Sequence, residues 1–247
     1  LLLWSVLAPK PYPVENREVA VKGITSSTPV VGVPVLDDAK EKFLSAELPA
    51  FEFPTGKAKL IFTEQNAAIK EIIFNTYQQY KFPLRYGLMI DDASLQFKRM
   101  SNLEKEMSNL ENKIGYVQSD QYKKIAKDFI FTGKVYDFWL EINVQNVSSE
   151  TITLSLPIIL GVLDFSANNM ESRYLGTAVK TRAKEKLIYL NGRKDTVQDG
   201  VEFVALHDRY FCALIEPEST GCSAFIRKLN SKESEVVLSC DKMVLAP

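Results

Sequence analysis

The chain has 247 residues, with 30 lysines and arginines against 31 aspartates and glutamates and a formal net charge of −1. This near-balance excludes a general electrostatic attraction to nucleic acid or to an anionic membrane surface. Hydrophobic residues at 46% and charged residues at 25% exclude disordered, collagen-like and disulfide-scaffold classes. One histidine, His207, and three cysteines, Cys212, Cys222 and Cys240, leave little for a metal site or a histidine-dependent triad.

The first seven residues are apolar and uncharged, and Pro9, Pro11 and Pro13 follow them. A spanning helix needs roughly 20 apolar residues, and a signal peptide begins with basic residues. Trp4 fits the aromatic belt at a membrane surface. We interpret residues 1–7 as the end of a transmembrane helix; the alternative is a buried strand that begins the domain. The chain also ends on a strand pattern without a polar tail, so we expect an excerpt of a longer protein.

Residues 8–50 have a different composition, with six prolines and a Ser-Ser-Thr cluster at 26–28. This composition predicts an extended linker. The linker can carry one short helix from Asp37 or Asp38 to Leu48, because an aspartate N-cap precedes apolar residues at helical spacing.

Strand patterns begin after the linker. Residues 57–63 and 69–77 are rich in β-branched and aromatic residues and predict a hairpin around residues 64–68. Residues 135–147 alternate, which places Phe138, Leu140, Ile142 and Val144 on one face. Residues 146–150 are the expected turn, and residues 151–162 the expected partner strand. Further strands are expected at 129–131, 174–180, 185–190, 201–207, 210–215, 222–229 and 236–245. Strands at such close spacing favour an antiparallel sandwich over βαβ units.

One segment, about residues 92–127, is expected to be a helical insertion. It contains no proline, and Leu103, Met107, Leu110 and Ile114 recur at helical spacing, which predicts an amphipathic helix. A second helical piece is expected from Asp120 to Lys127. The apolar stripe is either a docking surface for a partner or the side of the helix that packs on its own sheet.

The motifs that carry chemistry are absent: the sequence has no GxGxxG, GxxxxGK[ST], HExxH, GxSxG or CxxC. We therefore predict no catalytic residue, cofactor or metal site. If residues 217–221 join two paired strands, Cys212 lies opposite Ile226, and three buried, reduced cysteines are expected. The triplet His207-Asp208-Arg209 is expected to be a turn between strands rather than an acid–base pair.

Residues 200–217, Gly-Val-Glu-Phe-Val-Ala-Leu-His-Asp-Arg-Tyr-Phe-Cys-Ala-Leu-Ile-Glu-Pro, resemble the signature of the large periplasmic domain of the YidC membrane protein insertase family. Three further stretches resemble the family in its order: residues 59–77, residues 125–132, and residues 136–148, a long strand that ends in Asn146. The resemblance covers roughly residues 1–247. Its motif residues are Phe203, Asp208, Arg209, Tyr210, Phe211, Pro217 and Asn146.

The chain departs from the family pattern at three places. The family usually has tryptophan where Phe203 stands, a glycine pair where Ala67 and Ala68 stand, and lysine where Arg209 stands. The alanine pair bears on the geometry of the first hairpin turn, because glycine readily adopts a positive φ and alanine does not.

The resemblance implies a mainly β protein, an antiparallel β-supersandwich of two stacked sheets with a few helices, like that of galactose mutarotases. It implies a domain at residues 51–247 on the periplasmic side of the bacterial inner membrane, anchored through the N-terminal helix. The family's insertion machinery lies in later transmembrane helices. This domain is therefore expected to assist insertion by contact with Sec translocon components and nascent membrane proteins, with the stripe at residues 103–114 or the sheet rim as the contact surface.

The alternative is a carbohydrate-binding or mutarotase-like domain, since supersandwich proteins include both. Mutarotase chemistry needs an acid and a base near one sugar ring, and one histidine in the whole chain supports it poorly. Binding alone needs only exposed aromatic residues, for which Trp139, Tyr136 and Tyr174 are candidates. The two hypotheses differ in whether such aromatics cluster with carboxylates in a cleft or are scattered.

Overall fold

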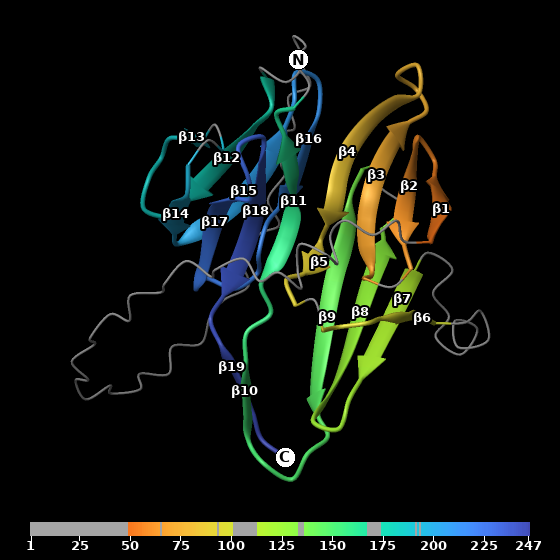
Figure 1. Cartoon of the computed structure of the whole chain (residues 1–247), viewed down its shortest axis with the longest axis vertical. Helices are drawn as coiled ribbons and strands as arrows, with labels where there is room; N and C mark the ends of the chain where they lie inside the picture. The colour runs from red at the N-terminus through yellow and green to blue at the C-terminus, as the bar shows by residue number, and fades with distance from the viewer. Residues whose placement is uncertain are drawn as a thin grey trace, which may run out of the picture. The chain divides into compact units, whose positions relative to one another are not determined.

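Strands are the long regular elements of the computed structural model of this chain (Figure 1). The structure describes residues 49–64, 66–92, 94–100, 113–132, 136–166, 174–190, 192 and 194–247, which belong to one compact unit, Val35–Pro247. The part of the chain so described contains no α-helix. The expected transmembrane end at residues 1–7 and nearly all of the expected linker at residues 8–50 lie outside it.

Two four-stranded sheets form the first half. One has the order β1-β2-β3-β4 and the other the order β6-β7-β8-β9, with all neighbours antiparallel. Their inner faces meet through aromatic rings: Phe62 lies edge-on to Phe129 with centroids 4.9 Å apart, and Phe53 stacks on Phe131 at 4.6 Å. The strands are β1 (Ala50–Thr55), β2 (Ala58–Thr63), β3 (Ala68–Phe74), β4 (Tyr80–Gly87), β6 (Lys98–Arg99), β7 (Lys113–Ser119), β8 (Lys123–Phe131) and β9 (Phe138–Asn146).

Two further sheets and a ribbon form the second half. A five-stranded sheet has the order β14-β17-β18-β11-β5, a four-stranded sheet the order β13-β12-β15-β16, and β10 pairs with β19. The strands are β5 (Met89–Ile90), β10 (Ile152–Leu154), β11 (Ile158–Asp164), β12 (Gly176–Thr181), β13 (Ile188–Leu190), β14 (Thr196–Asp199), β15 (Val201–His207), β16 (Cys212–Ile215), β17 (Cys222–Lys228), β18 (Glu233–Cys240) and β19 (Met243–Leu245).

Gly161 on β11 lets three sheets approach one another. A Cβ atom at this position would lie 2.5 Å from the Leu84 carbonyl oxygen on β4 and 2.6 Å from Leu206 Cδ1 on β15. Real Cβ atoms do not tolerate such distances, so only glycine fits here. Buried apolar residues of both halves form one continuous core around this crossing, from Leu60 on β2 to Leu238 on β18.

The strand predictions are confirmed in large part. The hairpin of β2 and β3 is present, and β9 alternates as expected, with Phe138, Leu140, Ile142 and Val144 packed against the core. One pairing is wrong: residues 151–162 are not the partner of β9. Pro157 interrupts that stretch, so β10 pairs with β19, β11 pairs with β18 and β5, and β9 pairs with β8.

The helical prediction for residues 92–127 is wrong wherever the structure describes it. Ile114 lies on β7, fully buried, and residues 123–131 form strand β8. Ile114 and Tyr116 both point to the core, which is the two-residue period of a strand. The helical spacing of Leu103, Met107 and Leu110 before them led to the helical prediction. Those three residues lie outside the described ranges.

A lysine is fully buried between the two sheets of the first half. Lys127 on β8 donates hydrogen bonds from Nζ to the Ala67 carbonyl oxygen, at 2.6 Å, and to the Leu88 carbonyl oxygen. Ala67 and Leu88 both have a positive φ, of 50° and 63°, in the region that favours glycine. The ammonium group therefore holds two irregular backbone segments, one beside the β2–β3 turn and one before β5.

Lys127 is expected to make stability depend on pH. Burial lowers its pKa to about 7, whereas an unfolded chain keeps the ordinary lysine value of about 10.4. Between these values the unfolded chain binds more protons, so the free energy of unfolding should rise with pH. Urea titrations from pH 7 to about 9.5 should show this rise in the wild type, and Lys127→Met should flatten it.

The exposed neighbour Lys124 supplies the control for that titration: Lys124→Met should keep the rise. Measurements stop below about pH 10, because burial also raises the pKa of Tyr116 above its ordinary value and tyrosine ionisation would then act in the opposite direction. Stability that stays constant or falls between pH 7 and about 9.5 in the wild type would contradict the prediction.

Candidate functional site

An open depression of about 500 Å³ lies at one end of the β13-β12-β15-β16 sheet. Gly176 and His207 are directly opposite each other on β12 and β15, and a Cβ atom at Gly176 would lie 3.0 Å from His207 Nε2. Glycine at this place therefore leaves room for the imidazole. The lining residues are Tyr174, Leu175, Gly176, Tyr189, Leu190, His207, Asp208 and Arg209.

Aromatic rings and a cation line this depression. Tyr189 is 69% exposed and lies edge-on to the His207 ring at 6.2 Å, and Tyr174 is 46% exposed. The Arg209 guanidinium carbon lies 5.4 Å from the centre of the Tyr174 ring and 5.3 Å from that of Tyr210, a cation–π geometry.

The carboxylate of Asp208 is already engaged by the protein. Its Oδ1 accepts hydrogen bonds from the backbone N–H groups of Tyr210 and Phe211, both at 2.7 Å, and its Oδ2 accepts one from the Tyr80 hydroxyl at 2.7 Å. This is an Asx turn that also binds β15–β16 to the start of β4. The expected turn between strands is confirmed for Asp208 and Arg209, whereas His207 is the last residue of β15. The Asp208 side chain fixes this turn.

His207 has no close carboxylate partner among the hydrogen bonds of the described residues. Its Nδ1 lies 3.4 Å from the Asp208 backbone carbonyl oxygen, which is a long contact for a hydrogen bond. A general base is normally oriented by a second group at about 2.6–3.2 Å. Among the described residues, no carboxylate lies within hydrogen-bond distance of the His207 ring.

Tyr210 and Phe211 differ in burial, although both lie before β16 in the turn that Asp208 holds rather than on the strand that was expected there. Tyr210 is 58% exposed, whereas Phe211 packs on the core and stacks on Phe74 with centroids 4.0 Å apart. Tyr80 also contacts the Phe211 ring, at 5.0 Å. Phe211 therefore joins the β15–β16 turn to strands β3 and β4 of the β1-β2-β3-β4 sheet.

The other motif residues are also mainly structural. Asn146 donates from Nδ2 to the carbonyl oxygens of Glu150, at 2.7 Å, and Leu245, at 3.1 Å, and so fixes the turn after β9 to β19. Phe203 is half-buried on β15 opposite Lys180, and Pro217 is half-buried in the loop after β16. Of the motif residues, only Asp208 and Arg209 line the depression.

The aromatic residues named for a sugar site are scattered. Tyr174 lines the depression, Trp139 is 57% exposed on the outer face of β9, and the ring of Tyr136 contacts Phe74 at 5.7 Å. Tyr189 and Gly176 were not foreseen as site residues. In the sequence, these two residues are marked only by their positions near the ends of expected strands. The register of β12 with β13 and β15 is needed to show that they lie beside His207.

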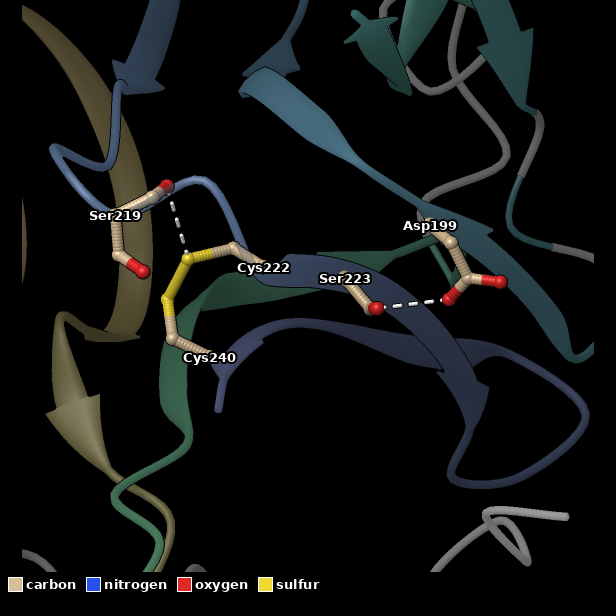
Figure 2. Close-up of a disulfide and its surroundings, with 5 residues drawn as sticks. All are labelled: Asp199, Ser219, Cys222, Ser223 and Cys240. Atoms are coloured by element: carbon tan, nitrogen blue, oxygen red, sulfur yellow. Dashed lines mark hydrogen bonds between the residues drawn. A yellow bond between two sulfur atoms is a disulfide. The ribbon is translucent and has the colours of Figure 1, made fainter. Parts of the chain in front are cut away.

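A disulfide joins β17 to β18, which corrects the expectation of three reduced cysteines. Cys222 and Cys240 are directly opposite each other and bonded (Figure 2). Cys212 is free and exposed on β16. The expectation rested on pairing residues 210–215 with residues 222–229. In the structure β16 pairs with β15 and Ile226 lies between Thr196 and Val236, so the partner of Cys222 comes from further along the chain.

Removal of this disulfide is expected to lower the free energy of unfolding by about 3 kcal/mol, the loop-entropy value for cysteines 18 residues apart. Cys240→Ser measured by urea unfolding tests this value. Cys212→Ser is the matched control and should change it by less than about 0.5 kcal/mol, because that cysteine is exposed and unbonded. A reductant should destabilise the wild type and leave Cys240→Ser unchanged; equal sensitivity of the two would contradict the assignment.

No helix in the described ranges combines the length and the hydropathy needed to cross a membrane. The same residues contain no cluster of three or more histidine, cysteine or acidic side chains placed to hold a metal ion.

No protein-family model and no curated protein sequence matches the chain. Solved structures do match. A galactose mutarotase related enzyme from Lactobacillus acidophilus has a TM-score of 0.54 and 9% sequence identity, over 78% of this chain and 85% of its own. A galactose mutarotase-like protein from Lactobacillus casei has a TM-score of 0.55 and 8% identity, over 80% and 95%. At these identities the likeness establishes the fold alone, and it confirms the antiparallel, galactose-mutarotase-like β-sandwich.

Proposed function

We propose that this chain is the periplasmic domain of a membrane protein insertase that resembles the YidC family. The domain assists the insertion and folding of integral membrane proteins, and it acts by protein contact rather than by catalysis. Its partners are components of the Sec translocon and nascent membrane proteins. Its place is the periplasmic side of the bacterial inner membrane.

The observation that carries this proposal is the meeting of three separate stretches that resemble the family. Phe74 from residues 59–77 lies 5.7 Å from Tyr136, which begins residues 136–148, and 4.0 Å from Phe211 of residues 200–217. Residues that lie far apart in the sequence thus form one aromatic cluster. A chance resemblance gives no reason for its parts to pack together, whereas a shared fold does.

The disulfide supports the proposed location. Bonds such as Cys222–Cys240 form and persist in the periplasm and outside cells, and they are rare in the cytosol. The chemistry of the depression supports contact over catalysis, because the Asp208 carboxylate already accepts three hydrogen bonds.

The cheapest test is the reading frame beyond Pro247. An insertase gene should encode about five further apolar segments of roughly 20 residues each, the length of a spanning helix. A frame that ends within a few residues of Pro247 would overturn the proposal.

A cellular test measures the role directly. The full-length protein is depleted and then replaced either by the wild type or by a variant that lacks residues 51–247. Insertion of a membrane protein substrate is read by protease protection, and co-purification of translocon subunits is measured in parallel. The deletion should reduce at least one of the two readouts. A point variant, Tyr122→Ala, is the control and should leave both readouts unchanged, because Tyr122 is 55% exposed and is not one of the motif residues. If the deletion changes neither readout, the proposal fails.

Saccharide binding at the depression is the second candidate function. The fold shared with galactose mutarotase-like proteins and the exposed rings of Tyr174 and Tyr189 beside His207 support it. Titration of the purified chain with galactose and glucose should then show saturable binding that Tyr189→Ala weakens at least tenfold and Tyr122→Ala does not. Polarimetry should show no faster sugar mutarotation. Accelerated mutarotation would identify an enzyme instead, and no saturable binding would remove this candidate.

A further inference from the structure

Strand β9 is a long edge strand. It lies at one end of the order β6-β7-β8-β9, and Figure 1 shows β8 and β7 on one side of it only. It pairs with β8 over nine residue pairs, from Phe138 opposite Phe131 to Asn146 opposite Lys123, with no shift of register. Within the part of the chain that the structure describes, no strand pairs with its other edge.

Residues 138–146 themselves carry none of the usual features that protect an edge strand. Edges are normally blocked by proline, a bulge, short length or a charge that points inward. Residues 138–146 contain no proline, and their pairing contains no bulge. The single charged residue, Glu141, lies on the exposed face. Among the described residues, no strand pairs with the outward-pointing N–H and C=O groups along this edge.

The side chains of β9 specify what such a strand carries. On the inner face Phe138, Leu140, Ile142 and Val144 are only half-buried against the core, whereas Ile125 and Phe129, on the neighbouring strand β8, are fully buried. An added strand with an apolar side chain at every second position would complete this burial. Its alternate residues would lie beside the exposed face, with Trp139 and the polar Asn143 and Gln145.

The surroundings of β9 favour a single extended segment over a second copy of the chain. Asn146, the last residue of β9, donates a hydrogen bond to the Leu245 carbonyl oxygen of β19, so the β10–β19 ribbon lies beside this end of the strand. One added strand needs only about 4.8 Å in the direction of pairing. A second copy would bring a whole sandwich to the same place.

We propose that the free edge of β9 binds an extended segment of a partner polypeptide by strand addition, with apolar side chains at every second position of the segment. Backbone hydrogen bonds supply the attraction, and the half-buried row on β9 selects the alternating pattern. The proposal rests on the proposed function only in that the partner is a polypeptide.

The test uses the purified 247-residue chain and nine-residue peptides of alternating valine and threonine with a lysine at each end. Saturating peptide should slow hydrogen exchange of amides within residues 138–146 at least tenfold. A peptide with the same residues in two blocks should bind at least tenfold more weakly. Two N-methylated peptides, each methylated at every second backbone amide, should differ. Methylation of the amides that face β9 should abolish binding, whereas methylation of the amides that face away should change the affinity by no more than about threefold.

Two variants of the chain complete the test. Ile142→Lys places a charge on the inner face of the edge, a natural way of blocking strand addition, and should abolish peptide binding. Asn143→Lys places the same charge on the exposed face and should leave binding within about threefold. If Ile142→Lys unfolds the chain, the pair of N-methylated peptides still decides the question on the wild type.

Three results would overturn the proposal: no slowed exchange within residues 138–146, equal binding by both N-methylated peptides, or a dimer of the peptide-free chain joined through β9 in sedimentation and exchange experiments. None of these depends on insertion in cells. Failure of strand addition is therefore distinguishable from failure of the proposed function, which the deletion of residues 51–247 tests separately.

Discussion

Replacing Arg227 by methionine is expected to lower the free energy of unfolding by about 3–5 kcal/mol. Arg227 Nη2 lies 2.8 Å from Asp91 Oδ2 and also contacts the carboxylate of Glu235, and all three side chains are almost completely buried. Methionine keeps much of the volume but leaves two buried carboxylates without their cation. Urea unfolding of the variant measures the loss.

Arg85→Met is the matched control for that measurement. Arg85 pairs with Glu233 of the same strand β18, but its side chain is 39% exposed, so water can solvate the remaining carboxylate. We expect a loss of roughly 1 kcal/mol or less. Combining Glu235→Gln with Arg227→Met should restore part of the unfolding free energy that Arg227→Met alone loses, because one of the two unpaired buried carboxylates is then removed. A loss below about 1 kcal/mol for Arg227→Met alone would contradict the assignment.

Replacing Phe129 by alanine is expected to cost about 3–5 kcal/mol, the range for a large side chain in a closed core. Phe129 on β8 is fully buried, and its ring lies 4.9 Å from Phe62, 6.1 Å from Tyr116 and 5.9 Å from Phe138. Its removal opens a cavity between the two sheets that these rings cannot fill by small movements. The denaturant midpoint, measured with an unchanged m-value, gives the loss.

Trp139→Ala provides the comparison on the neighbouring strand. Trp139 is larger than Phe129 but 57% exposed on the outer face of β9, so its truncation should cost less than about 1 kcal/mol. Equal losses for the two variants would mean that a face is misassigned, because a shift of one residue reverses inside and outside along a strand.

Strands with clear alternation could be predicted from the sequence. In β9 each apolar residue is followed by a polar one or by Trp139, and the hairpin of β2 and β3 is marked by β-branched runs. The turn at Asp208 could also be predicted, because an aspartate can hydrogen-bond the backbone two residues further along. These signals are local, and local chemistry decides them.

Of residues 113–131, only the strand at 129–131 was predicted correctly, because the pattern of residues 113–128 is ambiguous. Ile114, Tyr116, Ile125 and Phe129 are inner residues of strands β7 and β8, yet several of them fit helical spacing with apolar residues before them. The buried Lys127 adds to the ambiguity, since a lysine on the inner face of a strand breaks the alternation of apolar and polar residues. Only the carbonyl groups of Ala67 and Leu88, supplied by distant segments, make its burial acceptable.

The sequence by itself determined the mainly β class, the alternating faces of the long strands and the turn at Asp208, because these follow from side-chain period and turn chemistry along a few neighbouring residues. Only the tertiary structure decided which strands pair. That pairing set the Cys222–Cys240 bond, the depression that joins Tyr174, Tyr189 and His207, and the free edge of β9. Pairing depends on how whole faces pack and on close approaches such as that at Gly161, which no short window of sequence contains.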